Sequence, residues 1–249
     1  SRFYRQVAGE FAPLIPQTAH VLSVSKGLHP VSHIRLSEAA EQALGRGPVA
    51  VLSGPSHAEE VARRVPTAVV IACSDHDRAV ALQGIFNSAE FRVYTSEDVT
   101  GVELGGALKN VIAIAAGASD GIGFGDNTKA ALLTRGLAEM TRFGAALGAH
   151  PQTFAGLSGI GDLMVTCASH HSRNRGVGER LGRGEKMADI LASMEQVAEG
   201  VWTCRAALDE ARRLGISVPI IEQVDAVVHH GKDPRIAVRE LMGRDPRVE

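Results

Sequence analysis

The sequence predicts an α/β region followed by an all-helical region: a partial doubly wound sheet over residues 1–96 and a helical domain over residues 97–249. Two observations support this division. Before residue 96, short apolar runs rich in β-branched residues alternate with helical patterns, as in doubly wound, largely parallel sheets. After residue 96 we find no convincing strand, and helical periodicity continues to the end. We interpret this shift as a domain boundary.

The first region contains four predicted strands with helices between them. We expect strands at residues 20–25, 49–52, 67–73 and 91–94, and helices at 3–14, 37–44, 57–64 and 75–86. The second strand runs into a Ser-Gly-Pro-Ser turn at 53–56 and then a helix. A strand, a glycine turn and a helix start form an anion-binding corner in many proteins, but also an ordinary βα connection. The pattern leaves both interpretations open.

The second region contains eight predicted helices. They cover residues 98–118, 128–148, 151–155, 173–183, 186–192, 202–214, 218–229 and 234–242. At the start of the first of them, Thr95 and Ser96 are placed to cap the first amides. Glu97 and Asp98 suit the positive end of the helix dipole.

A lysine in the apolar middle of the helix predicted over 98–118 is the feature around which we interpret the rest. The neighbours of Lys109 at three and four residues, Gly105 and Gly106 among them, offer no counter-charge. Either the side chain reaches water along its apolar stem, or it lies in a partly dry pocket. In a dry pocket the pKa of the ammonium falls and the group can exchange a proton. Asn110 favours the pocket, since a buried amide needs partners or a ligand.

Three further stretches carry polar residues that packing does not require. Asp162 follows two glycines in a segment suited to burial, and the apolar-helix lysine is a candidate counter-charge. Ser172, Arg173 and Asn174 come just before a helical pattern and form either a phosphate site or a solvated, capped turn. The Val-Ala-Glu-Gly stretch at 197–200 also precedes a helix, which is equally typical of an ordinary turn.

Composition excludes several classes of protein. The net charge is −2 and no Lys/Arg block occurs, which argues against nucleic acid or an anionic membrane as the main partner. No apolar run is long enough to predict a membrane span, and no signal-peptide pattern opens the sequence. The three cysteines, Cys73, Cys167 and Cys204, are far apart. They predict reduced thiols in a cytoplasmic protein.

Two absences add to the interpretation. A dinucleotide-binding half normally opens with a strand, G-x-G-x-x-G and a helix, and this arrangement does not occur in the sequence. Because the sequence also begins without Met, we expect a fragment that lacks this phosphate cradle.

The histidine pairs have no third convergent ligand in the sequence, so we expect no metal site. These pairs are His29 and His33, His170 and His171, and His229 and His230.

Taken together, the motifs resemble those of the bacterial NAD(P)-dependent glycerol-3-phosphate dehydrogenases. The matching segments are SKG at 25–27, VLSGPSHAEEVA at 51–62, GALKNVIAIAAG at 106–117, GFGDNTKAALLTRGLAEM at 123–140, GLSGIGDLMVTC at 156–167, SRNR at 172–175 and VAEGV at 197–201. The resemblance implies a Rossmann domain that binds NAD or NADP, here without its first part, and a helical domain that completes the substrate site. It also implies hydride transfer between dihydroxyacetone phosphate and sn-glycerol 3-phosphate, which feeds glycerophospholipid synthesis.

The resemblance implies roles for residues of this sequence. Lys109 matches the proton-transferring lysine, Lys26 a second active-site lysine, and Asp162 the acid that partners the catalytic lysine. The substrate-binding positions are Lys26, Gly54, Ser56, Lys109, Asn110, Asp162, Ser172, Arg173 and Asn174. The cofactor-binding positions are Lys26, Ala58, Arg173, Val197 and Glu199. His170 and His171 depart from the less polar pair expected before Ser172.

Two other hypotheses stay open at this point. One is a non-catalytic helical module that binds a phosphorylated ligand or associates with itself. The other is a neighbouring enzyme of the hydroxy-acid or 6-phosphogluconate dehydrogenase group, which the combination of SGPS, GALKN and SRNR disfavours. For the dehydrogenase, we expect a small phosphorylated substrate, no nucleic-acid partner, no membrane span and a homodimer.

Overall fold

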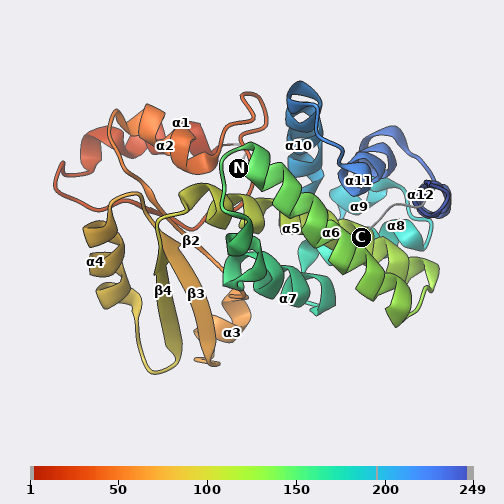
Figure 1. Cartoon of the computed structure of the whole chain (residues 1–249), viewed down its shortest axis with the longest axis horizontal. Helices are drawn as coiled ribbons and strands as arrows, with labels where there is room; N and C mark the ends of the chain where they lie inside the picture. Colours follow the sequence, from red (N-terminus) through yellow and green to blue (C-terminus); the bar gives the residue numbers. More distant parts are fainter. Residues whose placement is uncertain (1–2, 195, 246–249) are drawn as a thin grey trace.

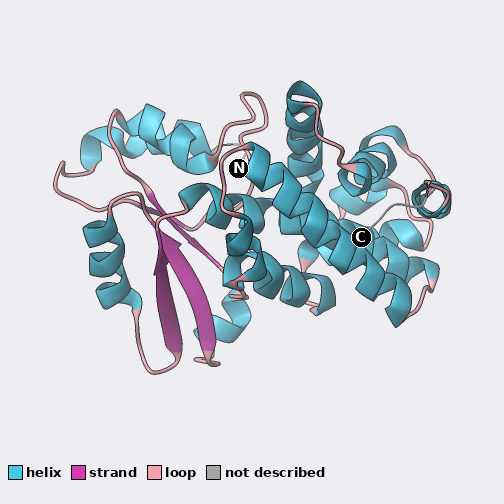
Figure 2. Cartoon of the chain, in the orientation of Figure 1, coloured by secondary structure: helices cyan, strands magenta, loops and turns pink. Residues whose placement is uncertain are grey.

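The computed structural model describes residues 3–194 and 196–245. Its strands gather on one side of the molecule, and its other side consists of helices (Figures 1 and 2). Through Ser96 the elements are α1 (Tyr4–Phe11), η1 (Ala12–Leu14), β1 (Leu22–Ser23), α2 (Leu36–Leu44), β2 (Ala50–Ser53), α3 (Ala58–Ala62), β3 (Thr67–Ala72), α4 (His76–Phe86) and β4 (Phe91–Ser96). Each predicted strand and helix of this region is present, with shifted ends.

After β4 the described residues form helices and turns only. They are α5 (Val99–Ile122), α6 (Asp126–Ala146), η2 (Pro151–Ala155), η3 (Leu157–Gly161), α7 (Asp162–Ala168), α8 (Arg173–Gly182), α9 (Met187–Ala192), α10 (Gly200–Leu214), α11 (Pro219–His230) and α12 (Pro234–Met242). The predicted fold class, a partial α/β region followed by helices, is confirmed. The continuous helical stretch over η3 and α7 was not predicted. Gly156, Ser158, Gly159 and Gly161 lie close together at its start, and such a cluster is typical of a turn.

The sheet has the order β1-β2-β3-β4 and is mixed. The pairs β1–β2 and β3–β4 are parallel, but β2 and β3 are antiparallel, with Leu52 opposite Ile71. The expectation of a largely parallel sheet is therefore wrong for the central pair. A parallel pair needs a crossover that brings the chain back along the sheet, usually on a helix. The helix between β2 and β3, α3, has only five residues.

Both faces of this sheet are covered. Side chains alternate between the two faces of a strand, so neighbouring residues of β3 join different clusters. Ile71 packs with Val93 and with Leu82 of α4, whereas Ala72 packs with Val102 near the start of α5. The first turns of α5 thus attach the sheet to the helical region.

Helix α5 begins with a different cap from the one predicted. Asp98 is the N-cap, and its Oδ1 accepts a hydrogen bond of 2.8 Å from the backbone nitrogen of Gly101. Thr95 and Ser96 belong to β4 instead, although the Ser96 hydroxyl accepts a bond of 3.1 Å from the Asp98 nitrogen. The other end stops at Gly123, whose φ of 91° lies in the left-handed region that glycine tolerates.

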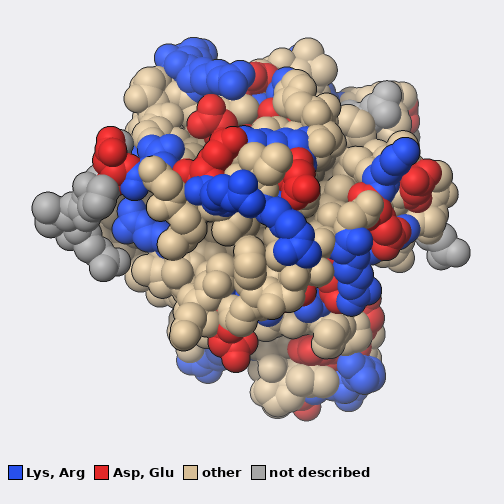
Figure 3. All heavy atoms as spheres, turned by 90° about the vertical axis from the view of Figure 1, so that its right-hand side faces the viewer, with Lys and Arg blue, Asp and Glu red and all other residues tan. Residues whose placement is uncertain are grey.

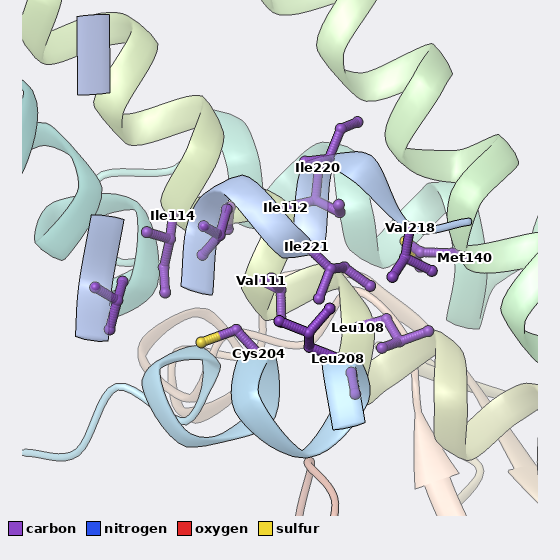
Figure 4. Packing of buried hydrophobic residues seen from close by; sticks show 14 of the residues in the cluster. Leu108, Val111, Ile112, Ile114, Met140, Cys204, Leu208, Val218, Ile220 and Ile221 are labelled. Carbon is purple, nitrogen blue, oxygen red and sulfur yellow. The ribbon is translucent and has the colours of Figure 1, made fainter. Parts of the chain in front are cut away.

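The central part of α5 forms the core of the helical region. Leu108, Val111 and Ile112 pack against residues of α6, α10 and α11 (Figure 4). By length and composition alone this helix could cross a membrane, contrary to the sequence expectation, but 83% of its most apolar window is buried inside the protein. That burial is the property of a core helix.

Helices α5 and α8 cross with their backbones in contact. A Cβ built on Gly117 of α5 would lie 1.9 Å from the carbonyl oxygen of Arg175. A Cβ built on Gly178 of α8 would lie 1.9 Å from the carbonyl oxygen of Ile114. Only glycine fits such an approach, and the close crossing fixes the start of α8 beside the middle of α5.

Charges are mixed on the helical side of the molecule. Figure 3 shows Lys and Arg interspersed with Asp and Glu on this face. Ion pairs also occur between residues close in the sequence of the helical region, for example Arg180 with Glu185 and Arg213 with Glu210. Among the described residues, neither sign of charge therefore dominates this face (Figure 3).

Candidate active site

Lys109 lies inside the protein and does not reach outward along its stem. Its side chain is 7% exposed. The ammonium group donates to Oδ1 of Asp162 and, at 2.8 Å, to the hydroxyl of Thr166. Of the two interpretations left open by the sequence, the structure therefore favours the partly dry pocket.

Asp162 joins two lysines from distant parts of the chain. Its side chain is 1% exposed, and its second oxygen, Oδ2, accepts a bond of 2.8 Å from Nζ of Lys26. Lys26 comes from the loop after β1, Lys109 from α5 and Asp162 from the start of α7. The same Lys26 ammonium also donates to the carbonyl oxygen of Gly54 at 3.3 Å. The result is one buried carboxylate between two ammonium groups.

Thr166 is a member of this group that the sequence interpretation missed. It follows Asp162 by one helical turn, and its hydroxyl donates to the Asp162 carbonyl oxygen at 2.6 Å. The lone pairs of the hydroxyl then face the Lys109 ammonium. The sequence signal that could have identified it is a hydroxyl four residues after an acid in an apolar segment, because this spacing puts both on the same face of a helix.

The surroundings of Lys109 shift its titration toward the neutral form. Burial and, second, the charge of Lys26 lower the pKa of the Lys109 ammonium from 10.5 to about 7. Asp162 opposes this shift by stabilising the ammonium, but with the smaller effect. The sequence left open which influence is larger; in the folded protein it is desolvation. A lysine with a pKa near neutrality can both give and accept a proton.

The turn after β2 lies next to the Lys26 ammonium group. Gly54 has φ of 133°, and a Cβ there would lie 3.1 Å from the Cα of Val69. The Ser56 hydroxyl donates to the Gly54 carbonyl oxygen at 3.0 Å, and Ala58 begins α3 with an exposed side chain. Through Lys26, which binds the Gly54 carbonyl, this turn is tied to the buried carboxylate.

The two asparagines predicted to bind substrate bind each other. Nδ2 of Asn174 donates to Oδ1 of Asn110 at 2.9 Å, and Oδ1 of Asn174 accepts from the Gly200 nitrogen at 2.9 Å. Nδ2 of Asn110 donates to the Gly106 carbonyl oxygen at 3.3 Å. Both amides are buried and connect α5, α8 and α10. Ser172 caps α8 by accepting from the Arg175 nitrogen at 3.2 Å.

The two arginines of the Ser-Arg-Asn-Arg segment differ in their surroundings. Arg175 is buried and forms ion pairs with Asp120 at 2.7 Å and with Glu179 at 3.1 Å. Arg173 is exposed, and its positive charge interacts with the carboxyl group of Glu59 in α3. Arg175 is therefore committed to the fold, whereas Arg173 is open to an anionic ligand.

Two of the positions predicted to contact a cofactor, Val197 and Glu199, directly precede α10. The hydrogen bond from Gly200 to Asn174 fixes the start of α10 beside residues 172–174. Glu199 is the N-cap residue of α10, and Val197 exposes 57% of its surface.

A cavity of about 700 Å³ lies elsewhere, between α5, α6, α11 and α12. Ile114, Leu132 and Val224 are among the residues that line it. Neither lysine and no residue of the 172–174 segment lines this cavity, so it is separate from the buried carboxylate.

One of the histidines near residue 230, His229, belongs to a group of possible metal ligands that the sequence did not predict. Potential ligand atoms of Cys204, Asp225 and His229 all lie within 4.8 Å of one another. Ordinary bonds account for all three, however. Arg205 donates to Asp225 at 2.8 Å, and the Val201 carbonyl oxygen accepts from Cys204 at 3.2 Å and lies 2.8 Å from Nε2 of His229. An ion here would have to displace the arginine.

Comparison with known proteins identifies close relatives. Residues 1–79 match the family described as NAD-dependent glycerol-3-phosphate dehydrogenase N-terminus, and residues 98–239 match its C-terminus. The NAD(P)+ glycerol-3-phosphate dehydrogenase of Geobacillus kaustophilus is 51% identical over 248 residues, 98% of this chain and 72% of the relative. That of Geobacter sulfurreducens is 50% identical over 252 residues and covers 100% and 75%. The crystal structure of glycerol-3-phosphate dehydrogenase from Coxiella burnetii superposes with a TM-score of 0.94 at 38% identity, covering 98% of this chain and 75% of that one.

Proposed function

The chain belongs to the NAD(P)-dependent glycerol-3-phosphate dehydrogenase family, and from this premise we propose how its residues act. The reaction interconverts dihydroxyacetone phosphate and sn-glycerol 3-phosphate. The observation that carries our assignment of the residues is the buried lysine Lys109, held by Asp162 and Thr166 with its pKa lowered to about 7.

Lys109 is the proton donor to the ketone oxygen in our proposal. When the ketone is reduced, its oxygen gains negative charge and needs a proton; in reverse, a base must accept that proton from the hydroxyl. A lysine with a pKa of about 7 is present in both forms at neutral pH, which suits a reversible reaction. Reduction is then expected to slow, and oxidation to speed up, as pH rises through neutrality.

Lys26 and Asp162 assist this transfer in different ways. The Lys26 ammonium, 2.8 Å from Asp162, adds positive charge beside the developing oxyanion. Asp162 and Thr166 hold the Lys109 nitrogen in one position by accepting two of its hydrogen bonds. Positioning of this kind reduces the entropy that the reaction would otherwise lose.

The phosphate end of the substrate is assigned to Arg173, together with Ser172 and the turn at Gly54 and Ser56. Arg173 is exposed and its planar guanidinium can make two parallel bonds to phosphate. Asn110 and Asn174 act chiefly by holding α5, α8 and α10 together, because their amides already bond to each other. Any direct contact of these asparagines with substrate uses their remaining lone pairs and protons.

A nicotinamide cofactor supplies or accepts the hydride. On this chain, Lys26, Ala58, Arg173, Val197 and Glu199 are the residues we assign to its contacts. The hydrogen bond between Gly200 and Asn174 supports this, because it joins the start of α10, which follows Val197 and Glu199, to the residue after Arg173.

We extend the proposal to organisation and location. Residues 1–96 are assigned to the C-terminal part of a dinucleotide-binding domain, and residues 97–249 to a helical substrate domain. A cytoplasmic location is supported by Cys73, Cys167 and Cys204, which are all buried and unpaired. A homodimer is expected, and sedimentation analysis of the purified chain tests it.

Replacement of Lys109 by Met tests the assignment directly. We would join the chain to the preceding segment of the Geobacillus kaustophilus relative, which supplies a cofactor-binding start, and measure turnover of dihydroxyacetone phosphate. The variant keeps the apolar bulk but loses the proton, so kcat should fall by about 100-fold or more. Lys186→Met, at an exposed lysine, is the control and should retain turnover. Near-normal turnover in Lys109→Met would contradict the assignment.

A further inference from the structure

His57 has a buried nitrogen without a hydrogen-bond partner. It lies between Ser56 and Ala58, in the turn that leads into α3, and its ring is partly buried. Its Nε2 is shielded from solvent and finds no hydrogen-bond partner among the described residues. Buried polar atoms are nearly always bonded, and an unbonded one costs free energy that a suitable ligand would recover. The position of this nitrogen therefore needs an explanation.

The ring of His57 lies near both ends of the proposed substrate site. The charges of Lys109 and Asp162 both act on it. The segment before Asp162 packs against the same turn, since a Cβ on Gly161 would lie 3.8 Å from Cδ of Pro55. On another side, its ring centroid is 5.9 Å from that of His171, which precedes the Ser172–Asn174 segment. Besides a hydrogen bond to its own backbone, the charges of His171, His57 and Arg173 lower the pKa of the Glu59 carboxyl. The imidazole therefore lies next to the loop that leads to Ser172, and the charges of the reacting lysine and of Asp162 act on it.

In the free protein the neutral form of this ring is favoured. Burial lowers the pKa of His57, and the positive charge of Lys109 lowers it further. Glu60, the Val165 backbone and Asp162 act in the opposite direction with smaller effects. A phosphate dianion placed against the ring would add two negative charges and reverse this balance.

From this geometry we propose that His57 is a further substrate-binding residue: its Nε2 donates a hydrogen bond to the phosphate group of the substrate, and the imidazole takes up a proton as that group binds. The proposal rests on the function proposed above. The titratable and charged groups that face the ring come from every element packed against it. Glu59 and Glu60 belong to α3, Lys109 to α5 and Asp162 to α7, and His171 lies in the loop before α8. Arg173 of α8 acts on the neighbouring Glu59.

Calorimetry of glycerol 3-phosphate binding to the 249-residue chain tests the proposal. Titrations at pH 7.5 in two buffers with different enthalpies of ionisation give the number of protons taken up on binding. At this pH a phosphate monoester, with a second pKa of about 6, is already a dianion, so uptake is by protein groups. His57→Gln should take up fewer protons than the wild type and bind about 10- to 100-fold more weakly, as for loss of a bond to a charged group. His76→Gln, at an exposed histidine of α4, is the matched control and should bind like the wild type.

A second measurement follows His57 in the unaltered chain. The ring signal of His57 in NMR, assigned by its loss in His57→Gln, should titrate at higher pH with glycerol 3-phosphate present and at the same pH with glycerol. If His57→Gln binds as tightly as the wild type and with equal proton uptake, the proposal is wrong while the substrate site stands. If the wild-type chain binds no glycerol 3-phosphate, the proposed substrate site itself fails, and the role of His57 with it.

Discussion

Replacing Lys109 by Met should change the pH dependence of stability in a way that can be calculated. The pKa of this lysine is 10.5 in an unfolded chain and about 7 in the folded protein. Between these two values the unfolded state binds more protons than the folded state. Stability therefore rises with pH in this window, by about 1.4 kcal/mol per pH unit once the folded group is neutral. Below pH 7 both states are protonated, so the free energy of unfolding no longer changes with pH through this lysine, and the full cost of burying its ammonium remains.

The magnitude follows from these two values. Between pH 6 and pH 9, the free energy of unfolding of the wild type should gain about 2–3 kcal/mol relative to Lys109→Met, which has no such group to titrate. Burial is nearly complete, since the Lys109 side chain is 7% exposed, so solvent screening removes little of the effect. Titrating groups remote from Lys109 are common to both proteins and cancel in the difference, which therefore reports Lys109 together with its interactions with Lys26 and Asp162.

Urea denaturation of both proteins at pH 6, 7, 8 and 9 measures this difference. Lys186→Met, at an exposed lysine, is the matched control for loss of a lysine elsewhere. A difference between wild type and Lys109→Met that stays constant over the range, or shrinks as pH rises, would refute the argument that desolvation dominates at Lys109. The same desolvation that destabilises the ammonium makes it a proton donor near neutral pH.

Three other predictions concern separate features. In the chain joined to the preceding segment of the Geobacillus kaustophilus relative, Arg173→Ala should raise the KM for dihydroxyacetone phosphate by about 10-fold or more, since a bond to phosphate is worth about 1.5–3 kcal/mol. The KM for dihydroxyacetone, which has no phosphate, should stay nearly unchanged. Equal increases of both KM values in steady-state kinetics would exclude a phosphate contact. Gly178→Ala should destabilise the fold by about 1–3 kcal/mol because its Cβ would meet the Ile114 carbonyl. Gly176→Ala, on the same helix with open space around it, should be neutral or stabilising; similar urea midpoints for the two variants would contradict the close crossing. The 249-residue chain should bind NADH or NADPH weakly and show no turnover, because its sequence contains no glycine phosphate cradle; low-micromolar binding in calorimetry, with turnover, would show that prediction to be wrong.

Local patterns were sufficient for the fold class and most elements. Alternating apolar runs and helical periodicity depend on neighbours within a few residues, and these predicted the strands and all the longer helices. The direction of β3 was not predictable in this way. It depends on where the chain goes after β2, and the five-residue α3 gives no sequence signal for that path. The η3–α7 segment was missed because its glycines disfavour a helix locally, whereas its packing against α5 stabilises one.

The sequence by itself also singled out Lys109 and Asp162, since a charge in an apolar stretch requires an explanation wherever it occurs. Only the tertiary structure decided what each does. Lys109 and Asp162 are separated by 53 positions in the sequence, and Lys26 and Asp162 by 136. Whether such groups meet depends on the packing of α5, α7 and the sheet. Burial, which determines the direction of the Lys109 pKa shift, is a property of that packing and not of neighbouring residues.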